Sequence, residues 1–370
     1  MRSSAGGIIM FALNRSQPEK LMENIFKRQV QSVEEVNFSD DNSITGRVST
    51  KSHSVHKYMV TFSDGGKMPV ICKYKSKNII INGAMLLNYN NDPRFYVHVM
   101  RSRKVLGFNS SYFREIVFYQ NIDDSLKKHL VEIYGSCRDD RKSLYVTAMR
   151  EMANTVPLSR DVIYRIIDAI TDFHAFYYND HSVVKRLELN EYTTKDYKIS
   201  KPLLRMVFHG LDEGSRGIFS EENYLKLTHF IENIDDFHSG LPCHNTLTHN
   251  DFSPRNIFWT EDSVHIYDWE LACYQNPEHD LVEFIIMIMS SLSDAEVLEW
   301  MQCFKRLLAQ KADVRISDEE YRKIIEFNIM EYCVNRMSVL RAANRRLKLE
   351  FIDSMAVNAN RLMNLVIKGE

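Results

Sequence analysis

The pattern of hydrophobic and polar residues changes character along the chain. In the first part, apolar residues gather in short β-rich runs at residues 57–62 and 69–74, which flank a turn at residues 63–66. That turn contains an Asp-Gly pair, and an Asp-Gly pair between two β-rich runs favours a hairpin. A further run of this kind occupies residues 143–149, and a helix is expected from 111 to 119. The first part of the chain therefore predicts a small antiparallel sheet with a helix beside it.

The second part of the chain has helical spacing. Ile163, Ile166, Ile167 and Ile170 follow an i, i+3, i+4, i+7 pattern, which indicates an amphipathic helix, and Ser159 is a suitable N-cap for it. Further helices are expected at residues 200–210, 220–238, 278–292, 293–311, 317–346 and 347–367. A short strand pair, residues 257–259 and 264–267, interrupts them.

Together these patterns predict an α+β protein with two lobes. We expect an N-terminal extension over residues 1–30, a small antiparallel-sheet N-lobe over residues 31–150, and a larger, mainly helical C-lobe over residues 151–370. A cleft between two lobes is a common place for a ligand.

The composition excludes several classes of protein. Hydrophobic residues are 44% and charged residues 26%, an ordinary globular balance, and 47 basic against 49 acidic residues argue against a nucleic-acid binder. The six cysteines include no Cys-x-x-Cys pair, so a zinc ribbon is not expected and a reducing cytoplasmic location fits best. No apolar stretch reaches the roughly 18 residues that a membrane span needs. The oligomeric state stays open.

One stretch of the chain contains candidate catalytic and metal-binding residues. His249 is followed by Asp251, Asn256 lies five positions after Asp251, and Asp268 lies twelve further on. A hairpin between Asn256 and Asp268 would bring both to the same end, where an amide oxygen and a carboxylate can hold Mg²⁺. Asp251, separate from that pair, is free to accept a proton from an attacking hydroxyl group.

The chained pattern resembles the catalytic loop and metal-binding Asp of the aminoglycoside phosphotransferase and choline kinase family, the small-molecule branch of the protein-kinase-like fold. It comprises His249-x-Asp251-x4-Asn256, then Asp268 within Tyr-Asp-Trp-Glu, and later an Asp-Leu pair at Asp280. The resemblance implies a two-lobed kinase-like fold, ATP and Mg²⁺ as cofactors, and transfer of the γ-phosphoryl group to a hydroxyl of a small molecule. Asp251 would be the base, and Asn256 and Asp268 the metal ligands.

The resemblance also implies residues that support the loop and bind the nucleotide. His249 would be structural, and Asp280 would hold the loop through hydrogen bonds to backbone amides. Lys73, which follows three apolar strand residues, resembles the lysine that binds the α and β phosphates, and Glu115 its helical partner. Lys75 shares the face of Lys73 by strand alternation and is the alternative.

Other nucleotide contacts are less specific. The phosphate-covering turn is expected around Ser43 and Thr45, although it has one glycine and no G-x-G-x-x-G pattern. The connector between the lobes includes Glu151 and Met152, where adenine would bond backbone groups.

The acceptor is expected to be an aminoglycoside, a choline-like amino alcohol or a sugar. Glu270 and Asp212 could form an acidic rim for an amine, and Trp269 an aromatic wall for a quaternary amine, with burial in the core as the alternative for the tryptophan.

Two other functions remain open. The irregular phosphate turn leaves room for a catalytically inactive nucleotide-binding scaffold, although Asp251, Asn256 and Asp268 are all present. A protein kinase is disfavoured because no Arg stands between His249 and Asp251 and no activation segment follows Asp268.

Overall fold

A computed structural model of the chain describes residues 18–37, 54–78, 81, 84, 93–152, 155–210, 218–242 and 244–367. Three residues named above, Ser43 and Thr45 of the expected phosphate turn and Asp212 of the expected acceptor rim, lie outside these ranges.

The small lobe is built on an antiparallel sheet with strand order β1-β2-β3-β5-β4. Its strands are β1 (Val30–Val36), β2 (Ser54–Phe62), β3 (Lys67–Lys75), β4 (Ile133–Asp139) and β5 (Leu144–Arg150). The expected hairpin joins β2 to β3. Gly65 has a φ of +82° in its turn, a conformation that a glycine adopts at no steric cost.

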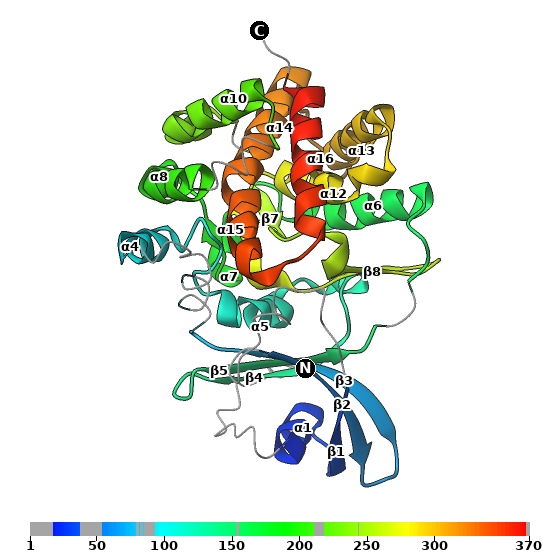
Figure 1. Ribbon diagram of the computed structural model, residues 1–370. Helices are drawn as coiled ribbons and strands as arrows, with labels where there is room; N and C mark the ends of the chain where they lie inside the picture. Colours follow the sequence, from blue (N-terminus) through cyan, green and yellow to red (C-terminus); the bar gives the residue numbers. More distant parts are fainter. Residues whose placement is uncertain are drawn as a thin grey trace.

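Two helices cover opposite faces of this sheet (Figure 1). Helix α1 (Pro18–Phe26) buries Leu21, Met22 and Ile25 in the apolar cluster on one face. Helix α5 (Ser111–Asn121) lies on the face toward the helical lobe, where Ile116 and Val117 pack in a cluster with Tyr145. Because α1 lies within the segment expected to be an extension, that segment contributes to the packing of the sheet.

The large lobe is mainly helical, as its spacing predicts. Ser159 caps α6 (Arg160–Phe176) by accepting a hydrogen bond from the backbone nitrogen of Val162. The other helices are α4 (Pro93–Ser102), α7 (Ser182–Arg186), α8 (Thr194–His209), α10 (Glu221–Glu232), α11 (Ile234–Ser239), α12 (Glu278–Ile288), α13 (Asp294–Ala312), α14 (Asp318–Tyr332), α15 (Ser338–Leu347) and α16 (Phe351–Val366).

Two of the expected helices are divided. Helices α10 and α11 replace one helix over 220–238, because the Asn233 side chain bonds back to the carbonyl of His229 and ends α10. A π-helical turn, η5 (Cys333–Met337), separates α14 from α15 within the segment expected as one helix over 317–346. Such π-helical turns are rare in proteins overall, and those that occur are often found at functional sites.

Short strands and turns join these helices near the small lobe. They are β6 (Asn190–Glu191), β7 (Thr246–Thr248) and β10 (Cys273–Gln275), which form one sheet, and the hairpin strands β8 (Ile257–Trp259) and β9 (Val264–Ile266). Short 3₁₀ turns are η1 (Asp124–His129), η2 (Pro254–Asn256), η3 (Trp269–Leu271) and η4 (Met289–Ser291).

Helix α4 joins the large lobe although it precedes α5 in the chain. Phe95 and Val99 of α4 lie in the same apolar cluster as the helical lobe, and α4 packs against α8. Within the described part of the chain, no helix has the length and apolarity to cross a bilayer. The five described cysteines are all free.

Candidate active site

The hairpin places two of the predicted metal ligands at one end. Ile257 pairs with Ile266, and the backbone nitrogen of Tyr267 donates to the carbonyl of Asn256 over 3.0 Å. Asn256 and Asp268 therefore lie at the same end of the hairpin, as expected. The Asn256 side-chain nitrogen donates to the carbonyl of Asp251 over 2.8 Å, which fixes the orientation of the amide.

Asp280 holds the loop that carries Asp251. Its two carboxylate oxygens accept hydrogen bonds from the backbone nitrogens of His249 and Asn250, each over 2.8 Å. His174 bonds the same carboxylate over 2.9 Å, and neither side chain of that pair is exposed. These contacts confirm the predicted bonds from Asp280 to backbone amides. We call Asp280, His174 and the amides of His249 and Asn250 the loop anchor.

The electrostatics of the loop anchor favour a charged carboxylate. Burial opposes ionisation of Asp280, but the hydrogen bond and charge of His174 outweigh it and lower the pKa of Asp280 below its ordinary value. His249 is fully buried, and its Nε2 pairs with the carbonyl of Tyr267 over 2.8 Å. His249 thus links the loop to the segment before Asp268.

A second buried charge cluster lies between the lobes. Lys73 lies 3.0 Å from Asp268 and 3.4 Å from Glu115, so the expected Lys–Glu pair is present. Lys75 lies 3.1 Å from Glu115 and 3.4 Å from Asp268, and it also pairs with Glu270. We call these five side chains the two-lysine cluster. Both lysines reach Glu115 and Asp268, so the geometry keeps Lys75 as an alternative to Lys73.

The charges of the two-lysine cluster depend on one another. Burial would raise the pKa of Asp268, but the Lys73 and Lys75 ammonium groups outweigh it and hold that pKa well below its usual range. Burial likewise opposes the charge of both lysines, and the surrounding carboxylates raise their pKa values instead. Within the cluster, Lys73, Lys75 and Asp268 are therefore all charged at neutral pH.

Helix α5 is fixed to this cluster by Arg114, which the sequence reasoning missed. The Arg114 side chain is fully buried, and its Nη1 donates to the carbonyl of Glu270 over 2.8 Å and to that of Gly107 over 3.4 Å. A fully buried arginine bonded to backbone carbonyls has no local sequence signal, because any amphipathic helix can carry an Arg beside a Glu.

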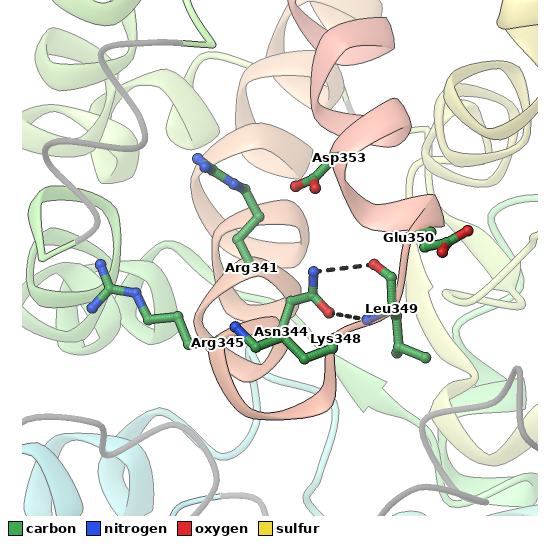
Figure 2. Close-up of a pocket in the computed structure, with 7 residues that line it drawn as sticks. All are labelled: Arg341, Asn344, Arg345, Lys348, Leu349, Glu350 and Asp353. Atoms are coloured by element: carbon green, nitrogen blue, oxygen red, sulfur yellow. Dashed lines mark hydrogen bonds between the residues drawn. The ribbon is translucent and has the colours of Figure 1, made fainter.

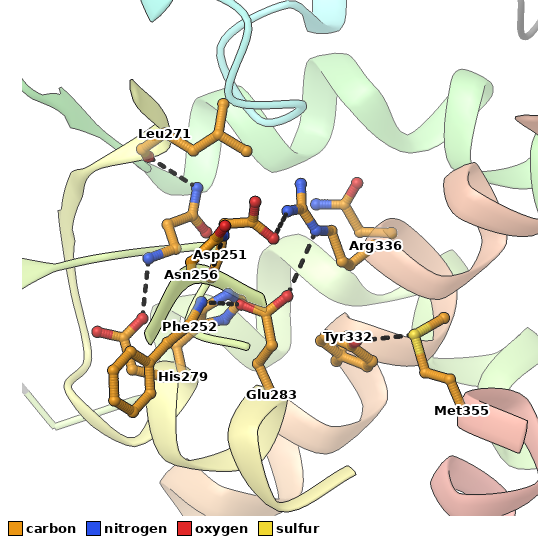
Figure 3. Close-up of polar contacts among 12 residues, drawn as sticks. Asp251, Phe252, Asn256, Leu271, His279, Glu283, Tyr332, Arg336 and Met355 are labelled. Atoms are coloured by element: carbon orange, nitrogen blue, oxygen red, sulfur yellow. Dashed lines mark hydrogen bonds and ion pairs between the residues drawn. The ribbon is translucent and has the colours of Figure 1, made fainter. Parts of the chain in front are cut away.

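Asp251 has a partner that the sequence reasoning also missed. Arg336, from the π-helical turn, forms an ion pair with Asp251 and lies 3.5 Å from Glu283 through its Nε (Figure 3). Glu283 in turn accepts a hydrogen bond from the backbone nitrogen of Phe252 over 2.7 Å. Since Arg336 follows Asp251 by 85 positions, only the tertiary structure brings the two together.

These contacts set the protonation of the loop carboxylates. Burial opposes ionisation of Asp251, but the Arg336 and Arg255 guanidinium groups outweigh it and lower its pKa. For Glu283 burial dominates and raises the pKa to about 8. Asp251 is therefore a carboxylate at neutral pH and can accept a proton or a hydrogen bond from a hydroxyl group.

Two expected acceptor residues face elsewhere. The Trp269 indole is fully buried and stacks on Phe118 with ring centroids 4.3 Å apart. It offers no surface to an acceptor, so the core alternative holds and the interpretation as an aromatic wall does not fit. Glu270 is turned toward Lys75 within the two-lysine cluster.

The connector residues lie at the edge of the sheet. Glu151 pairs with Lys57 over 2.5 Å, and Met152 is half-buried. Their backbone groups, which adenine would contact, directly follow β5.

Comparisons with known proteins agree with this architecture. The model of the phosphotransferase enzyme family (APH) matches residues 88–309. A spectinomycin phosphotransferase, APH(9)-Ia, solved with ADP and spectinomycin, is 10% identical with a TM-score of 0.51, and the match covers 96% of this chain and 100% of that one. No curated protein matches this chain.

Two further solved structures match with lower TM-scores. Aminoglycoside phosphotransferase APH(4)-Ia is 10% identical with a TM-score of 0.48, over 96% of this chain and 100% of that one. A fructosamine-3-kinase from Thermobifida fusca, whose assignment is itself provisional, is 16% identical with a TM-score of 0.44, over 94% and 100%. At such identities only the fold is comparable, and the match to the first structure confirms the predicted two-lobed, kinase-like α+β architecture.

Proposed function

Because the chain belongs to the phosphotransferase enzyme family, we propose that it transfers the γ-phosphoryl group of ATP to a hydroxyl group of a small molecule. One observation carries the proposal. The loop anchor holds the loop that carries Asp251, and the hairpin presents Asp268 to Lys73 and Lys75. This arrangement combines a candidate base with cations suited to phosphate oxygens.

The chemistry follows from those positions. Asp251 takes the proton of the acceptor hydroxyl as its oxygen forms a bond to the γ-phosphorus. The bond from that phosphorus to the bridging oxygen breaks, and ADP leaves with the electron pair. Lys73, with Lys75 as the alternative, neutralises the α and β phosphates, and Glu115 positions the lysine. Positioning and charge neutralisation do most of the work in such transfers.

The residues present fit Mg²⁺. Within the described chain no group of three or more His, Cys, Asp or Glu side chains is arranged to hold a metal. Mg²⁺ does not need such a group, because it usually takes one or two carboxylates and completes its shell with water and substrate phosphates. Asn256 and Asp268 would hold it, and when bound it supplies positive charge to the phosphate oxygens.

Other roles complete the proposal. Backbone groups at Glu151 and Met152 would bond adenine, and His249 and Asp280 would support the loop without touching substrate. Contacts from Ser43 and Thr45 to phosphate, the acceptor role of Asp212, the two lobe boundaries and a cytoplasmic location remain predictions from the sequence.

The test is ADP release from Mg-ATP with a panel of acceptors that includes aminoglycosides, choline, ethanolamine, sugars and homoserine. We expect acceptor-dependent release, and a loss on the order of 10²–10⁴-fold in kcat for Asp251→Asn, the usual contribution of a general base. Asp262→Asn, an exposed charge removal on the same hairpin, is the matched control. Near wild-type turnover of Asp251→Asn would refute the assignment of the base.

The same assay separates the alternatives. Nucleotide binding without turnover on any acceptor would favour the inactive scaffold. Phosphate appearing on a protein rather than on a small alcohol would favour a protein kinase.

A further inference from the structure

A pocket of about 490 Å³ lies where α15 turns into α16 (Figure 2). This volume falls within the usual range for small-molecule sites, roughly 300–1,000 Å³. Its charged lining consists of three cationic and two anionic side chains, namely Arg341, Arg345, Lys348, Glu350 and Asp353. Cations therefore exceed anions in this pocket, although the chain as a whole has a net charge of −2.

Two residues that flank this corner in the chain, Arg336 and Phe351, contact the catalytic loop. Arg336, which precedes Arg341 by five positions on the same helical run, forms the ion pair with Asp251. Five residues of α-helix advance about 7.5 Å along the axis at a rise of about 1.5 Å per residue. On the other side, the guanidinium of Arg255 lies 4.1 Å from the ring centroid of Phe351, which stands between Glu350 and Asp353.

The corner is formed by local bonds that need no ligand. The Asn344 side chain donates to the carbonyl of Leu349 over 3.1 Å and accepts a bond from its backbone nitrogen. Lys348 adopts a left-handed conformation, with φ of 58°, that reverses the chain. Arg345 and Lys348 are exposed at this corner. The cationic side of the pocket is thus built on a hydrogen-bonded turn beside the catalytic loop.

We propose that this pocket binds an anionic group, a carboxylate or a phosphate, of the acceptor, while a hydroxyl group of the same molecule reaches Asp251. The proposal rests on the proposed function and adds the chemical class of its substrate. The planar arginine side chain matches carboxylate and phosphate oxygens in a bidentate geometry. A polycationic acceptor would meet like charges at Arg345 and Lys348.

The geometry of the expected acidic rim agrees with this choice. Glu270 is paired with Lys75 rather than directed at an acceptor, and Trp269 is buried. Among the described residues, the two side chains expected to recognise an amine therefore do not do so.

The experiment measures direct binding without nucleotide, so it does not depend on turnover. The probes are hexoses that differ in one substituent, namely glucose, glucuronate, glucose 6-phosphate and glucosamine. Each is titrated into the 370-residue chain by calorimetry. We expect glucuronate or glucose 6-phosphate to bind at least tenfold more tightly than glucose, and glucosamine no better than glucose. Which of the two anions binds more tightly distinguishes a carboxylate from a phosphate.

Variants locate the binding. The Arg345→Gln/Lys348→Gln double variant should lose at least tenfold in affinity for the anionic hexose, and Glu350→Gln should gain severalfold because a like charge is removed. All three positions are exposed, so folding should be preserved. Arg322→Gln, an exposed charge removal elsewhere on the same lobe, is the control and should bind as the wild type does.

Three results would overturn the proposal: no binding of either anionic hexose, binding of glucosamine as tight as that of the anionic hexoses or tighter, or an anion affinity unchanged in the double variant. Titration of ADP in the same preparations tests the proposed function separately. ADP binding without anion selectivity would refute the pocket proposal and leave the proposed function standing. Anion selectivity without ADP binding would refute the proposed function, and the bound anion could then no longer be assigned to an acceptor.

Discussion

At the loop anchor a single carboxylate, Asp280, meets three donors, whereas in the two-lysine cluster three carboxylates share two lysines. The first arrangement satisfies its buried charge with neutral backbone groups and one histidine. The second has more negative than positive side chains, and each lysine has several partners. A satisfied network holds one geometry, whereas a cluster with an excess of carboxylates can accept a cation or exchange partners when a ligand arrives.

The neighbourhood of Asp280 contains its own contrast. Glu278 lies two positions earlier in the first turn of α12 and is also fully buried, but neither of its carboxylate oxygens has a hydrogen-bond partner among the described residues. Burial raises the pKa of Glu278 to about 7, whereas donors lower the pKa of Asp280. The pKa values of these two equally buried carboxylates thus move in opposite directions, because only Asp280 is hydrogen-bonded.

The largest expected effect comes from the two-lysine cluster. Asp268→Ala should reduce turnover by more than about 10³-fold, since several kcal/mol of charge stabilisation depend on the metal that this carboxylate would help to hold. The unfolding midpoint in urea should change little, because Lys73 and Lys75 keep Glu115 as a partner. Full metal-dependent activity in this variant would show that Asp268 holds no metal.

The next effect comes from the loop anchor. Asp280→Ala leaves two buried backbone N–H groups and His174 without their acceptor, so we expect a loss of about 2–5 kcal/mol in the free energy of unfolding. Urea denaturation measures it, with Asp294→Ala, an exposed acid, as the control. A loss of activity at unchanged stability would instead give Asp280 a direct role in catalysis.

The Glu278 contrast predicts a pH dependence. Because the folded-state pKa of about 7 lies above the ordinary 4.5, the folded protein keeps a proton that the unfolded chain releases. This contribution to stability is fully present below pH 4.5 and is lost as the pH rises through about 7. The difference in free energy of unfolding between Glu278→Gln and the wild type should therefore shift in favour of the variant from pH 5 to pH 8, by up to about 3 kcal/mol. Parallel curves for wild type and variant across this range would contradict the assigned environment.

The smallest expected effect distinguishes the role of Lys73 from that of Lys75. Lys73→Met should raise the KM for ATP about tenfold, the equivalent of one charged hydrogen bond, while stability changes little. Lys75→Met should mainly lower the melting temperature, because Lys75 is paired with three carboxylates, Glu115, Asp268 and Glu270, whereas Lys73 is paired with two. The reverse split would assign the phosphate contact to Lys75.

The parts of the site that lie close together in the chain were predictable. The hairpin register follows from the alternation of β8 and β9 about a short turn, so the common end of Asn256 and Asp268 could be predicted. The helix of Glu115 and the strand of Lys73 also have regular spacing, and their pairing agrees with the family resemblance. The roles of these residues in catalysis stay predictions until the variants are measured.

Other features have no local signal. Arg336, which pairs with Asp251, lies in a π-helical turn 85 positions further along the chain, and Arg114 of α5 donates to the carbonyl of Glu270, 156 positions away. Trp269 was expected at a binding surface, yet it lies between Phe118 and Phe173, two residues from other parts of the chain.

The sequence by itself determined the two hairpins, most helices of the large lobe, the order of the lobes and the loop that carries Asp251, because periodicity and turn chemistry act over a few residues. The tertiary structure decided which buried charges are paired, which aromatic side chains are core, and where the cationic pocket lies. Those properties depend on contacts between residues tens to hundreds of positions apart, whose desolvation and pairing no local pattern encodes.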